Sequence, residues 1–338
     1  MSKKWKYSLF GVLAVLFLAF CFIGWWVFRM ANVADSAHKS NEESRFSQIE
    51  SKPEYKPPEW EGSERVNVLL MGGDERGLRE GEVARSDSML VVSLDPQKKT
   101  IHLFSVLRDT WVEIPGYHDN RANVPLSLGG PDLAMKTIGN MLGLDIQYYA
   151  YVDFQGFIKL VDAIGGIDFY VEKDMHWSDS ADDHKYDINL KKGQQHLDGD
   201  HALQYVRFRH DRLSDFTRTG RQREFLGAIA DKLKSGWNLI KLPDILGKVV
   251  PYVETNMSSR DMLKLATLGY KSHQAGSAQA PPSELLADEK IGGSSVLAIR
   301  DKDALKGFVQ QTLATDTSLP EATPSPSAPQ ASGQSGGE

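Results

Sequence analysis

Cysteine is nearly absent from the chain, since Cys21 is the single one among 338 residues. One cysteine excludes an intrachain disulfide framework and any zinc site built from cysteines. The nine histidines show no ligand spacing such as HExxH, which argues against a histidine zinc site. Walker and GxGxxG signatures are also absent, so neither a P-loop nucleotidase nor a dinucleotide-binding enzyme is indicated.

Excess positive charge is absent from the main body of the chain. The formal net charge is −6, and the first 30 residues contain four cations and no acid. The remainder therefore has 35 cations against 45 acids. Because nucleic-acid binding depends on neutralising phosphates with Lys and Arg, this balance argues against a nucleic-acid partner.

Charged residues are missing from residues 7–28, a run of 22 mostly apolar residues. About 20 such residues cross a bilayer's hydrocarbon core as a helix, so the run predicts one transmembrane helix. Three lysines precede it, which places residues 1–6 in the cytoplasm and the rest outside. The alternative is a cleaved signal peptide, but the run is long for one and ends in Trp25-Trp26-Val27-Phe28-Arg29, a poor cleavage site. We therefore expect a single-pass signal-anchor in the cell membrane, with the lipid bilayer as a partner.

Three further segments follow the predicted anchor. Residues 29–64 are polar, contain three prolines and predict an extracytoplasmic linker. Residues 65–313 have the composition of a folded domain of large but ordinary size. Residues 314–338 are rich in Ser, Pro, Ala, Thr and Gly, which predicts a disordered tail.

Apolar runs within residues 65–313 predict an α/β fold. Residues 66–71, 89–94 and 100–106 predict strands, the last two joined by a hairpin connection at residues 95–99. Helices are predicted at residues 219–233 and 261–270.

Residues 148–171 have the pattern of a β-α-β unit. Residues 148–152 predict a strand, and Asp153 is a good N-cap for a helix through Ile164. Gly165-Gly166 ends that helix before a second strand at residues 167–171. The expected fold class is therefore a mixed central β-sheet flanked by helices, an α-β-α sandwich.

The strongest chemical signal is a cluster of arginines. Residues 207–223 contain six of the 16 arginines and no lysine, although lysine is commoner in the chain as a whole. The planar guanidinium binds phosphate or carboxylate through two parallel hydrogen bonds, whereas lysine offers a point charge. Arg218, Arg221 and Gln222 have the i, i+3, i+4 spacing that brings side chains together on a helix.

The pattern leaves two features of this cluster open. Arg207 and Arg209 share one face if the chain there is extended, but residues 200–205 could instead form a short helix of undetermined end. The whole cluster is also compatible with a solvated helix face whose arginines form ion pairs with Asp211, Asp215 and Glu224.

Acidic residues follow the predicted strands upstream. Asp74 comes after the Gly-Gly end of the first strand, and Asp87 follows Arg85 at the start of the next. Carboxylates at strand ends can hold Mg²⁺, which fills the rest of its shell with water and substrate phosphates. The structural alternatives are that Asp74 caps a turn and that Asp109 pairs with its neighbour Arg108.

Several ordered motifs resemble the LytR–CpsA–Psr family. The resemblance covers about residues 65–235 and weakens through residue 313. Its most specific part is the block from Tyr205-Val206-Arg207-Phe208-Arg209 to Asp215-Phe216-Thr217-Arg218-Thr219-Gly220-Arg221-Gln222-Arg223. The other matching motifs are Val66-Asn67-Val68-Leu69-Leu70-Met71-Gly72-Gly73-Asp74, Arg85-Ser86-Asp87-Ser88-Met89, Ser105-Val106-Leu107-Arg108-Asp109-Thr110, Gly129-Gly130-Pro131, Val161-Asp162-Ala163-Ile164-Gly165-Gly166-Ile167 and the segment from Gly193 to Leu197-Asp198-Gly199.

This resemblance implies a phosphotransferase of Gram-positive-type envelopes. Such proteins move an anionic glycopolymer, of the teichoic acid or capsular polysaccharide type, from a polyprenyl-pyrophosphate carrier to peptidoglycan. The acceptor is the 6-hydroxyl of N-acetylmuramic acid. The resemblance also implies an apolar tunnel for the polyprenyl chain and Mg²⁺ as cofactor, with Mn²⁺ as the alternative ion.

The resemblance assigns roles residue by residue. Asp74 and Asp87 would hold the metal, and Asp87, Arg85 and Arg108 would form the catalytic group. Arg121 stands where the family often has lysine, which keeps the charge but changes its geometry. The residues implied to bind pyrophosphate are Arg85, Arg108, Arg121, Arg207, Arg209, Arg218, Arg221 and Gln222.

Two other functions stay open on the sequence. The same site with water as acceptor would be a polyprenyl-pyrophosphate hydrolase, and a protein without catalysis would be an envelope regulator or scaffold. The sequence has the arginines and both aspartates of the motifs that it resembles. This favours an enzyme, because a scaffold does not need these side chains.

The predicted topology is testable on intact cells. Because three lysines flank the amino side of the apolar run, protease added to protoplasts should degrade residues 31–338 and leave the anchor protected. Immunoblotting before and after treatment measures this. Survival of the full-length chain in intact protoplasts, with digestion after lysis, would contradict the orientation.

Overall fold

The structure is a computed structural model that describes residues 29, 32, 44–47, 49, 55–73, 85–178, 184, 186–209 and 215–315. Among these residues, no helix is both long enough and apolar enough to cross a membrane. The predicted transmembrane segment at residues 7–28 and the tail beyond residue 315 lie outside the described residues.

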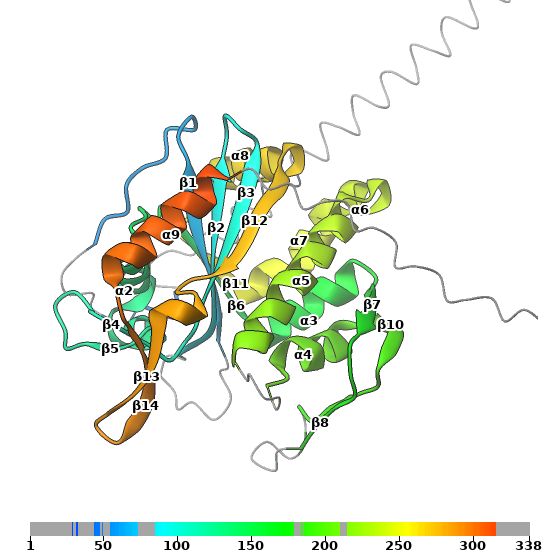
Figure 1. Ribbon diagram of the computed structural model, residues 1–338. Coiled ribbons are helices and arrows are strands. Elements are labelled where there is room, and N and C mark those ends of the chain that lie inside the picture. Colours follow the sequence, from blue (N-terminus) through cyan, green and yellow to red (C-terminus); the bar gives the residue numbers. More distant parts are fainter. Residues whose placement is uncertain are drawn as a thin grey trace, which may run out of the picture.

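A six-stranded mixed sheet forms the centre of the domain (Figure 1). In spatial order its strands are β11 (Val253–Thr255), β6 (Tyr148–Asp153), β1 (Val66–Gly73), β2 (Ser86–Asp95), β3 (Thr100–Val106) and β12 (His273–Gln279). β1 pairs antiparallel with β2 and parallel with β6, and β3 pairs antiparallel with β2 and parallel with β12. This confirms the expected mixed sheet and its first three strands.

Helices cover both faces of this sheet, as an α-β-α sandwich requires (Figure 1). On one face lie α2 (Pro125–Leu142) and α9 (Lys302–Ala314). On the other face lie α3 (Phe154–Ala163), α4 (Gly199–Arg207), α5 (Asp215–Lys234) and α7 (Leu242–Val249). Within the described residues, the remaining helical elements are α6 (Gly236–Ile240), α8 (Ser259–Lys271) and the 3-10 turns η2 (Val250–Tyr252) and η3 (Ser283–Leu285).

In the part of the chain that the structure describes, three smaller sheets surround this core. β7 (Ile167–Val171) pairs with β10 (Gly193–Leu197), and β8 (Met175–Trp177) pairs with β9 (Ile188–Leu190). The third sheet has the order β13 (Leu286–Ile291), β14 (Ser294–Ile299), β4 (Thr110–Val112) and β5 (Asn120–Arg121).

The β-α-β prediction is correct for its elements and wrong for their pairing. Asp153 caps α3 by accepting a hydrogen bond from the Gly156 amide at 2.8 Å. However, β7 pairs with β10 and does not join the central sheet. The sequence carries the reason: Asp168 and Tyr170 are exposed between buried residues, whereas a strand covered by helices on both faces is apolar throughout.

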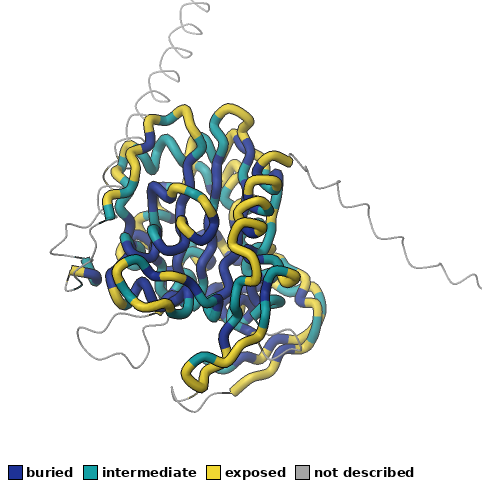
Figure 2. Tube along the Cα trace, turned by 60° about the vertical axis from the view of Figure 1, so that its left-hand side comes forward, coloured by how far each residue is buried: buried dark blue, intermediate teal, exposed yellow. Residues whose placement is uncertain are grey.

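The central strands lie buried between the helices that cover the two faces of the sheet (Figure 2). Their side chains alternate between the core formed with α2 and α9 and a smaller apolar cluster on the opposite face. Leu69 and Met71 face the core formed with α2 and α9. A second core joins α3, α4, α5 and α7 to the small β7–β10 sheet. Leu70 points to the opposite face from its neighbours because successive residues of a strand alternate, and it is half-buried there.

Parts of the predicted linker pack on the domain. Phe46 is 7% exposed and meets the rings of Tyr149 and Tyr151 edge to face, with ring centroids 6.4 and 5.5 Å away. Trp60 is also buried, in a third cluster with Val66 and Tyr148. At these two places the segment before β1 contributes to the folded core.

Candidate active site

A cavity of about 420 Å³ lies between the central sheet and helices α3, α4 and α5. Its lining divides into a polar and an apolar set. The polar side chains are Asp87, Ser88, Arg108, Asp153, Arg207, Arg209, Arg218 and Gln222. The apolar residues are Leu70, Met71, Gly72, Leu90, Ala150, Val152, Phe154, Phe157, Leu160, Trp177, Ile188, Leu203, Val206, Phe225 and Leu226.

The floor of the cavity changes from apolar to polar along the strands. Leu70 pairs with Leu90 on one side and with Ala150 on the other, which makes an apolar row across three strands. The next row on the same face contains Gly72, Ser88 and Val152. Beyond this row lie the charged residues Asp87 and Arg108. The register of the sheet therefore separates an apolar part of the cavity from a charged part.

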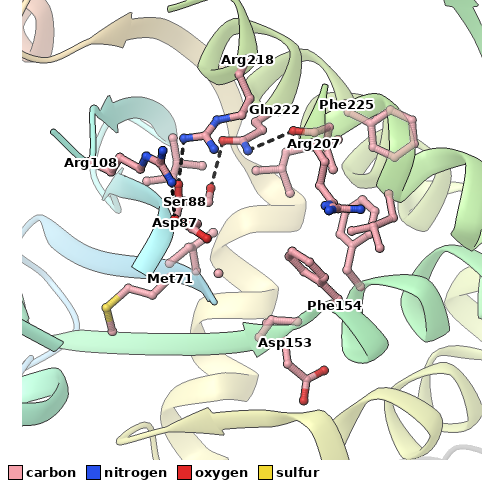
Figure 3. Close-up of a pocket in the computed structure, with 18 of the residues that line it drawn as sticks. Met71, Asp87, Ser88, Arg108, Asp153, Phe154, Arg207, Arg218, Gln222 and Phe225 are labelled. Carbon is pink, nitrogen blue, oxygen red and sulfur yellow. Dashed lines mark hydrogen bonds and ion pairs between the residues drawn. The ribbon is translucent and has the colours of Figure 1, made fainter. Parts of the chain in front are cut away.

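Asp87 and Arg108 meet at the charged end of the floor. β2 and β3 are antiparallel and Met89 pairs with Val106. Two residues further in the same direction, Asp87 therefore lies beside Arg108. Arg108 donates a hydrogen bond from Nη1 to Asp87 Oδ1 at 2.6 Å (Figure 3). Its Nε also lies 3.7 Å from Asp109 and 3.8 Å from Asp215. One guanidinium thus stands among three carboxylates.

Helix α5 supplies Arg218 and Gln222 from one face. Arg218 is 5% exposed and donates from Nη2 to the Asp87 carbonyl at 2.9 Å and to Asp215 Oδ2 at 3.1 Å. Gln222 accepts a hydrogen bond from the Ser88 hydroxyl at 2.9 Å and donates to the Val206 carbonyl at 3.2 Å (Figure 3). These contacts tie α5 to β2 and to the end of α4.

Arg207 and Arg209 lie at the end of α4. The open question of conformation is answered: α4 ends at Arg207, and Phe208 is its C-cap with an extended ψ of 127°. Arg207 donates to the Tyr186 carbonyl at 3.0 Å, and its guanidinium stands 5.0 Å from the Phe154 ring and 5.4 Å from the Tyr186 ring. Arg209 is exposed and lines the cavity.

Burial and neighbouring charge shift the arginine pKa values in opposite directions. Burial lowers the pKa of Arg218, and the like charge of Arg108 adds to this effect against the attraction of Asp215. Burial acts the same way on Arg108, but the hydrogen bond and charge of Asp87 outweigh it and raise the pKa. Both side chains stay charged near neutral pH, because the ordinary pKa of arginine is above about 12.

The two guanidiniums also hold buried donors without hydrogen bonds. Within the described residues, Nε of Arg108 and Nε of Arg218 have no hydrogen-bond partner. An unsatisfied buried donor costs about 1–3 kcal/mol. Such donors favour the approach of an oxyanion, which would supply acceptor oxygens.

The structure brings most of the predicted site residues together. Asp87, Arg108, Arg207, Arg209, Arg218 and Gln222 all line the cavity. Arg85 is exposed, directly precedes β2 and does not line it. Arg121 does not line the cavity but shares Asp109 with Arg108: its Nε lies 3.3 Å from Asp109, and its Nη2 donates to the Ser295 carbonyl at 3.1 Å. Asp74 lies outside the described residues.

Arg221 is on the same helix as Arg218 but turns away from the cavity. It is 4% exposed, pairs with Glu172 at 3.1 Å and donates to the Thr217 hydroxyl at 3.2 Å. It also donates to the carbonyl of Phe208, between Arg207 and Arg209. Arg221 therefore holds the end of α4 in place and contributes to the site through the backbone that carries the other arginines.

Sequence reasoning missed several lining residues. The sequence motif that contains Ser88 assigns this residue no role, but its hydroxyl donates a hydrogen bond to Gln222. Phe154, Phe157, Trp177 and Phe225 were missed because an aromatic residue that lines a cavity has the same local pattern as one in a solid core. One sequence signal for these aromatic residues was available. The first strand is apolar on both faces, which predicts apolar side chains packed on either side of it.

A family model described as the LytR_cpsA_psr family matches residues 25–311. The chain belongs to this family. It is 36% identical over 195 residues to the regulatory protein MsrR of Staphylococcus aureus, and it spans 57% of the length of that relative. It is 32% identical over 275 residues to TagV of Bacillus subtilis, which is named a polyisoprenyl-teichoic acid–peptidoglycan teichoic acid transferase; this covers 78% of the chain and 67% of TagV.

Solved structures of the family share this fold. The crystal structure of B. subtilis TagV has a TM-score of 0.61 and 30% identity, over 74% of this chain and 98% of TagV. The B. subtilis family protein TagT with bound octaprenyl pyrophosphate lipid has a TM-score of 0.57 and 26% identity, over 79% of this chain and 99% of TagT.

The role assigned to Arg221 predicts a stability effect. In Arg221→Lys the charge remains, but the one nitrogen of an ammonium cannot span the acceptors that Nε, Nη2 and Nη1 of the guanidinium reach at Glu172, Thr217 and the Phe208 carbonyl. We expect the free energy of unfolding to fall by about 1–3 kcal/mol, measured by urea denaturation.

Arg260→Lys is the matched control, since Arg260 is exposed on α8, and its change should stay within about 0.5 kcal/mol. Wild-type stability of Arg221→Lys together with a loss of ligand binding would contradict the structural role and make Arg221 a direct ligand.

Proposed function

We propose that this protein transfers an anionic glycopolymer from a polyprenyl-pyrophosphate carrier to the 6-hydroxyl of N-acetylmuramic acid in peptidoglycan. The observation that carries the proposal is a single cavity whose floor changes from leucine and alanine to serine, aspartate and arginine. A polyprenyl pyrophosphate has the same two parts, a long apolar tail and a compact, highly charged head.

The apolar part of the cavity suits the polyprenyl tail. Leu70, Leu90 and Ala150 form its floor, and Phe157 and Leu203 belong to the helices above it. Removing an apolar chain from water contributes about 25 cal/mol per Å² of buried surface. When the tail is bound in this apolar part, the pyrophosphate attached to it lies at the charged end of the cavity, next to the arginines.

The charged part suits the pyrophosphate. Arg207 and Arg218 line the cavity from α4 and α5, Arg209 from the residues just after α4, and Arg108 from the loop after β3. Guanidinium groups bind phosphate oxygens through paired charge-assisted hydrogen bonds. The same groups stabilise the negative charge that develops on phosphate oxygens in the transition state.

The transfer exchanges one phosphorus–oxygen bond for another. The acceptor hydroxyl oxygen bonds the phosphorus that bears the glycopolymer, and the bond from that phosphorus to the bridging oxygen breaks. Polyprenyl phosphate leaves with the bridging oxygen and its electron pair. The hydroxyl proton passes to Asp87 as base, since an attacking hydroxyl needs an acceptor within reach.

Asp87 is favoured as this base by its position. Asp153 is the other carboxylate among the described lining residues, but it caps α3 and lies 3.7 Å from Arg45. In Figure 3 its carboxylate points away from Arg108 and Arg218, whereas Asp87 lies between them.

A magnesium ion fits the donor set at this end. Within the described residues there is no group of three or more side chains able to hold a metal. Mg²⁺ needs only one or two protein carboxylates when substrate phosphates and water complete its shell. Asp87 offers one hard oxygen donor, and Asp74 directly follows Gly73, whose backbone pairs with Ser86. When bound, the ion supplies Lewis-acid stabilisation of charge on the phosphate oxygens, and Mn²⁺ is the alternative.

Two relatives support this proposal without deciding the substrate. TagV carries the name of a teichoic acid transferase, and TagT was solved with octaprenyl pyrophosphate. We propose a teichoic acid or capsular type of polymer for this chain, in a Gram-positive-type envelope. Residues 7–28 would hold the domain at the outer face of the membrane.

The function is tested by one incubation of the full chain. Purified protein is mixed with a lipid-linked glycopolymer, a peptidoglycan oligosaccharide and Mg²⁺, and products are separated by mass. A covalent polymer–glycan product supports the transferase. Release of polymer phosphate without attachment would make the protein a hydrolase, and no reaction would favour a regulator or scaffold.

Arg209→Lys gives a sharper test of the site. Arg209 is exposed, so the substitution should not impair folding, but it removes the paired hydrogen bonds to phosphate. We expect the transfer rate to fall by about 10²–10³, as for loss of one transition-state donor. Arg260→Lys serves as the control for charge-conserving change. Equal rates for both variants and wild type would mean that Arg209 acts only as diffuse charge.

A further inference from the structure

Helix α6 presents large apolar side chains to solvent. Trp237 is 67% exposed and Ile240 is 47% exposed. They are three residues apart on a five-residue helix, so they share one face. Asn238 holds the opposite face, because it is buried and donates to the Lys232 carbonyl at 2.9 Å and to the Ile164 carbonyl at 3.5 Å. The outward position of the two apolar residues is therefore fixed by the fold.

Lysines surround this apolar face. The ammonium of Lys241 lies 5.4 Å from the Trp237 ring. Lys234, at the end of α5, donates to the Ser272 carbonyl at 3.3 Å, which joins this end of α5 to the end of α8. There Tyr270 is 57% exposed and Lys271 is exposed. We call the group of Lys234, Trp237, Ile240, Lys241, Tyr270 and Lys271 the α6 surface.

The chain leaves the predicted membrane segment at the same end of the domain. Phe28 is the last residue of the apolar run, and Arg29 follows it directly. Arg29 Nη2 lies 3.0 Å from Asp244 Oδ1 on α7. The Asp244 amide donates to the Lys241 carbonyl at 2.9 Å, so Arg29 is held on α7 beside the α6 surface.

The α6 surface is also linked to the cavity. Asn238 bonds the Ile164 carbonyl at the C-cap of α3. The same helix lines the cavity with Phe157 and Leu160, and α7 packs against it. Helix α3 thus connects the apolar wall of the candidate site with the α6 surface.

We propose that the α6 surface docks on the outer face of an anionic lipid bilayer. Trp237 and Ile240 lie at the boundary between headgroups and acyl chains, about 5–10 Å deep, as apolar faces of interfacial helices do. Indole and phenol rings favour this boundary, and lysines beside them attract anionic headgroups. The contact would hold the C-terminal end of α3 toward the bilayer that contains the lipid-linked donor. The inference rests on the proposed anchoring of residues 7–28.

The test uses the full chain in vesicles of phosphatidylglycerol and phosphatidylcholine. Cys21→Ser removes the native cysteine, and Ile240→Cys takes an environment-sensitive fluorophore. Tyr170→Cys carries the same label as the matched control, since Tyr170 is 54% exposed on β7, a strand that contributes no residue to the α6 surface. Quenching is measured with a lipid-borne nitroxide and with aqueous iodide.

The label at position 240 should be quenched by the nitroxide and protected from iodide, whereas the label at position 170 should show the reverse. Nitroxide quenching at position 240 should decrease without phosphatidylglycerol and in a Lys234→Glu, Lys241→Glu variant. Equal behaviour of the two positions would overturn the proposal. Protection from iodide without nitroxide quenching, together with crosslinked dimers, would also overturn it and make a second copy the occupant.

Glycopolymer transfer is measured on the same labelled vesicles. Transfer with position 240 in water overturns the membrane contact and leaves the proposed function intact. Lipid contact at position 240 without transfer supports the docking surface and counts against the proposed function.

Discussion

The structure depends on keeping four charged arginines beside an apolar cavity, namely Arg108, Arg207, Arg209 and Arg218. Much of the surrounding structure stabilises these charges. A charge taken out of water is costly unless it is paired and hydrogen-bonded. Asp87, Asp109 and Asp215 surround Arg108, and Asp215 also pairs with Arg218. These carboxylates stabilise the guanidiniums without filling every donor, since Nε of both arginines has no hydrogen-bond partner among the described residues.

The cavity also needs a sharp boundary between its apolar and charged surfaces, and the register of the sheet determines where that boundary lies. Leu70, Leu90 and Ala150 form one row and Gly72, Ser88 and Val152 the next, so a shift of one residue would send the leucines into the opposite core. The core with α2 and α9 fixes that register, because Leu69 and Met71 are buried in it. Packing on one face of the sheet thus determines the chemistry on the other.

Local pattern was enough to predict the elements but not their partners. The first three strands and the cap at Asp153 follow from apolar runs and capping chemistry, and the structure has them. The pairing of β7 with β10 depends on a segment far along the chain, which no local pattern reports. The spacing of Arg218, Arg221 and Gln222 correctly indicated a helix, but it placed all three on one face. Arg221 is drawn away by Glu172 and the Phe208 carbonyl, which only the fold brings near.

The central claim is that one cavity holds both the tail and the head of a polyprenyl pyrophosphate. Its most direct measurement is the binding of a polyprenyl pyrophosphate to the full chain by native mass spectrometry, with inorganic pyrophosphate as the headgroup alone. Ala150→Phe places a ring in the apolar floor and leaves the arginines unchanged. The account predicts that wild type binds the lipid far more tightly than inorganic pyrophosphate and that Ala150→Phe abolishes this difference. Equal binding of the lipid by both proteins would contradict it.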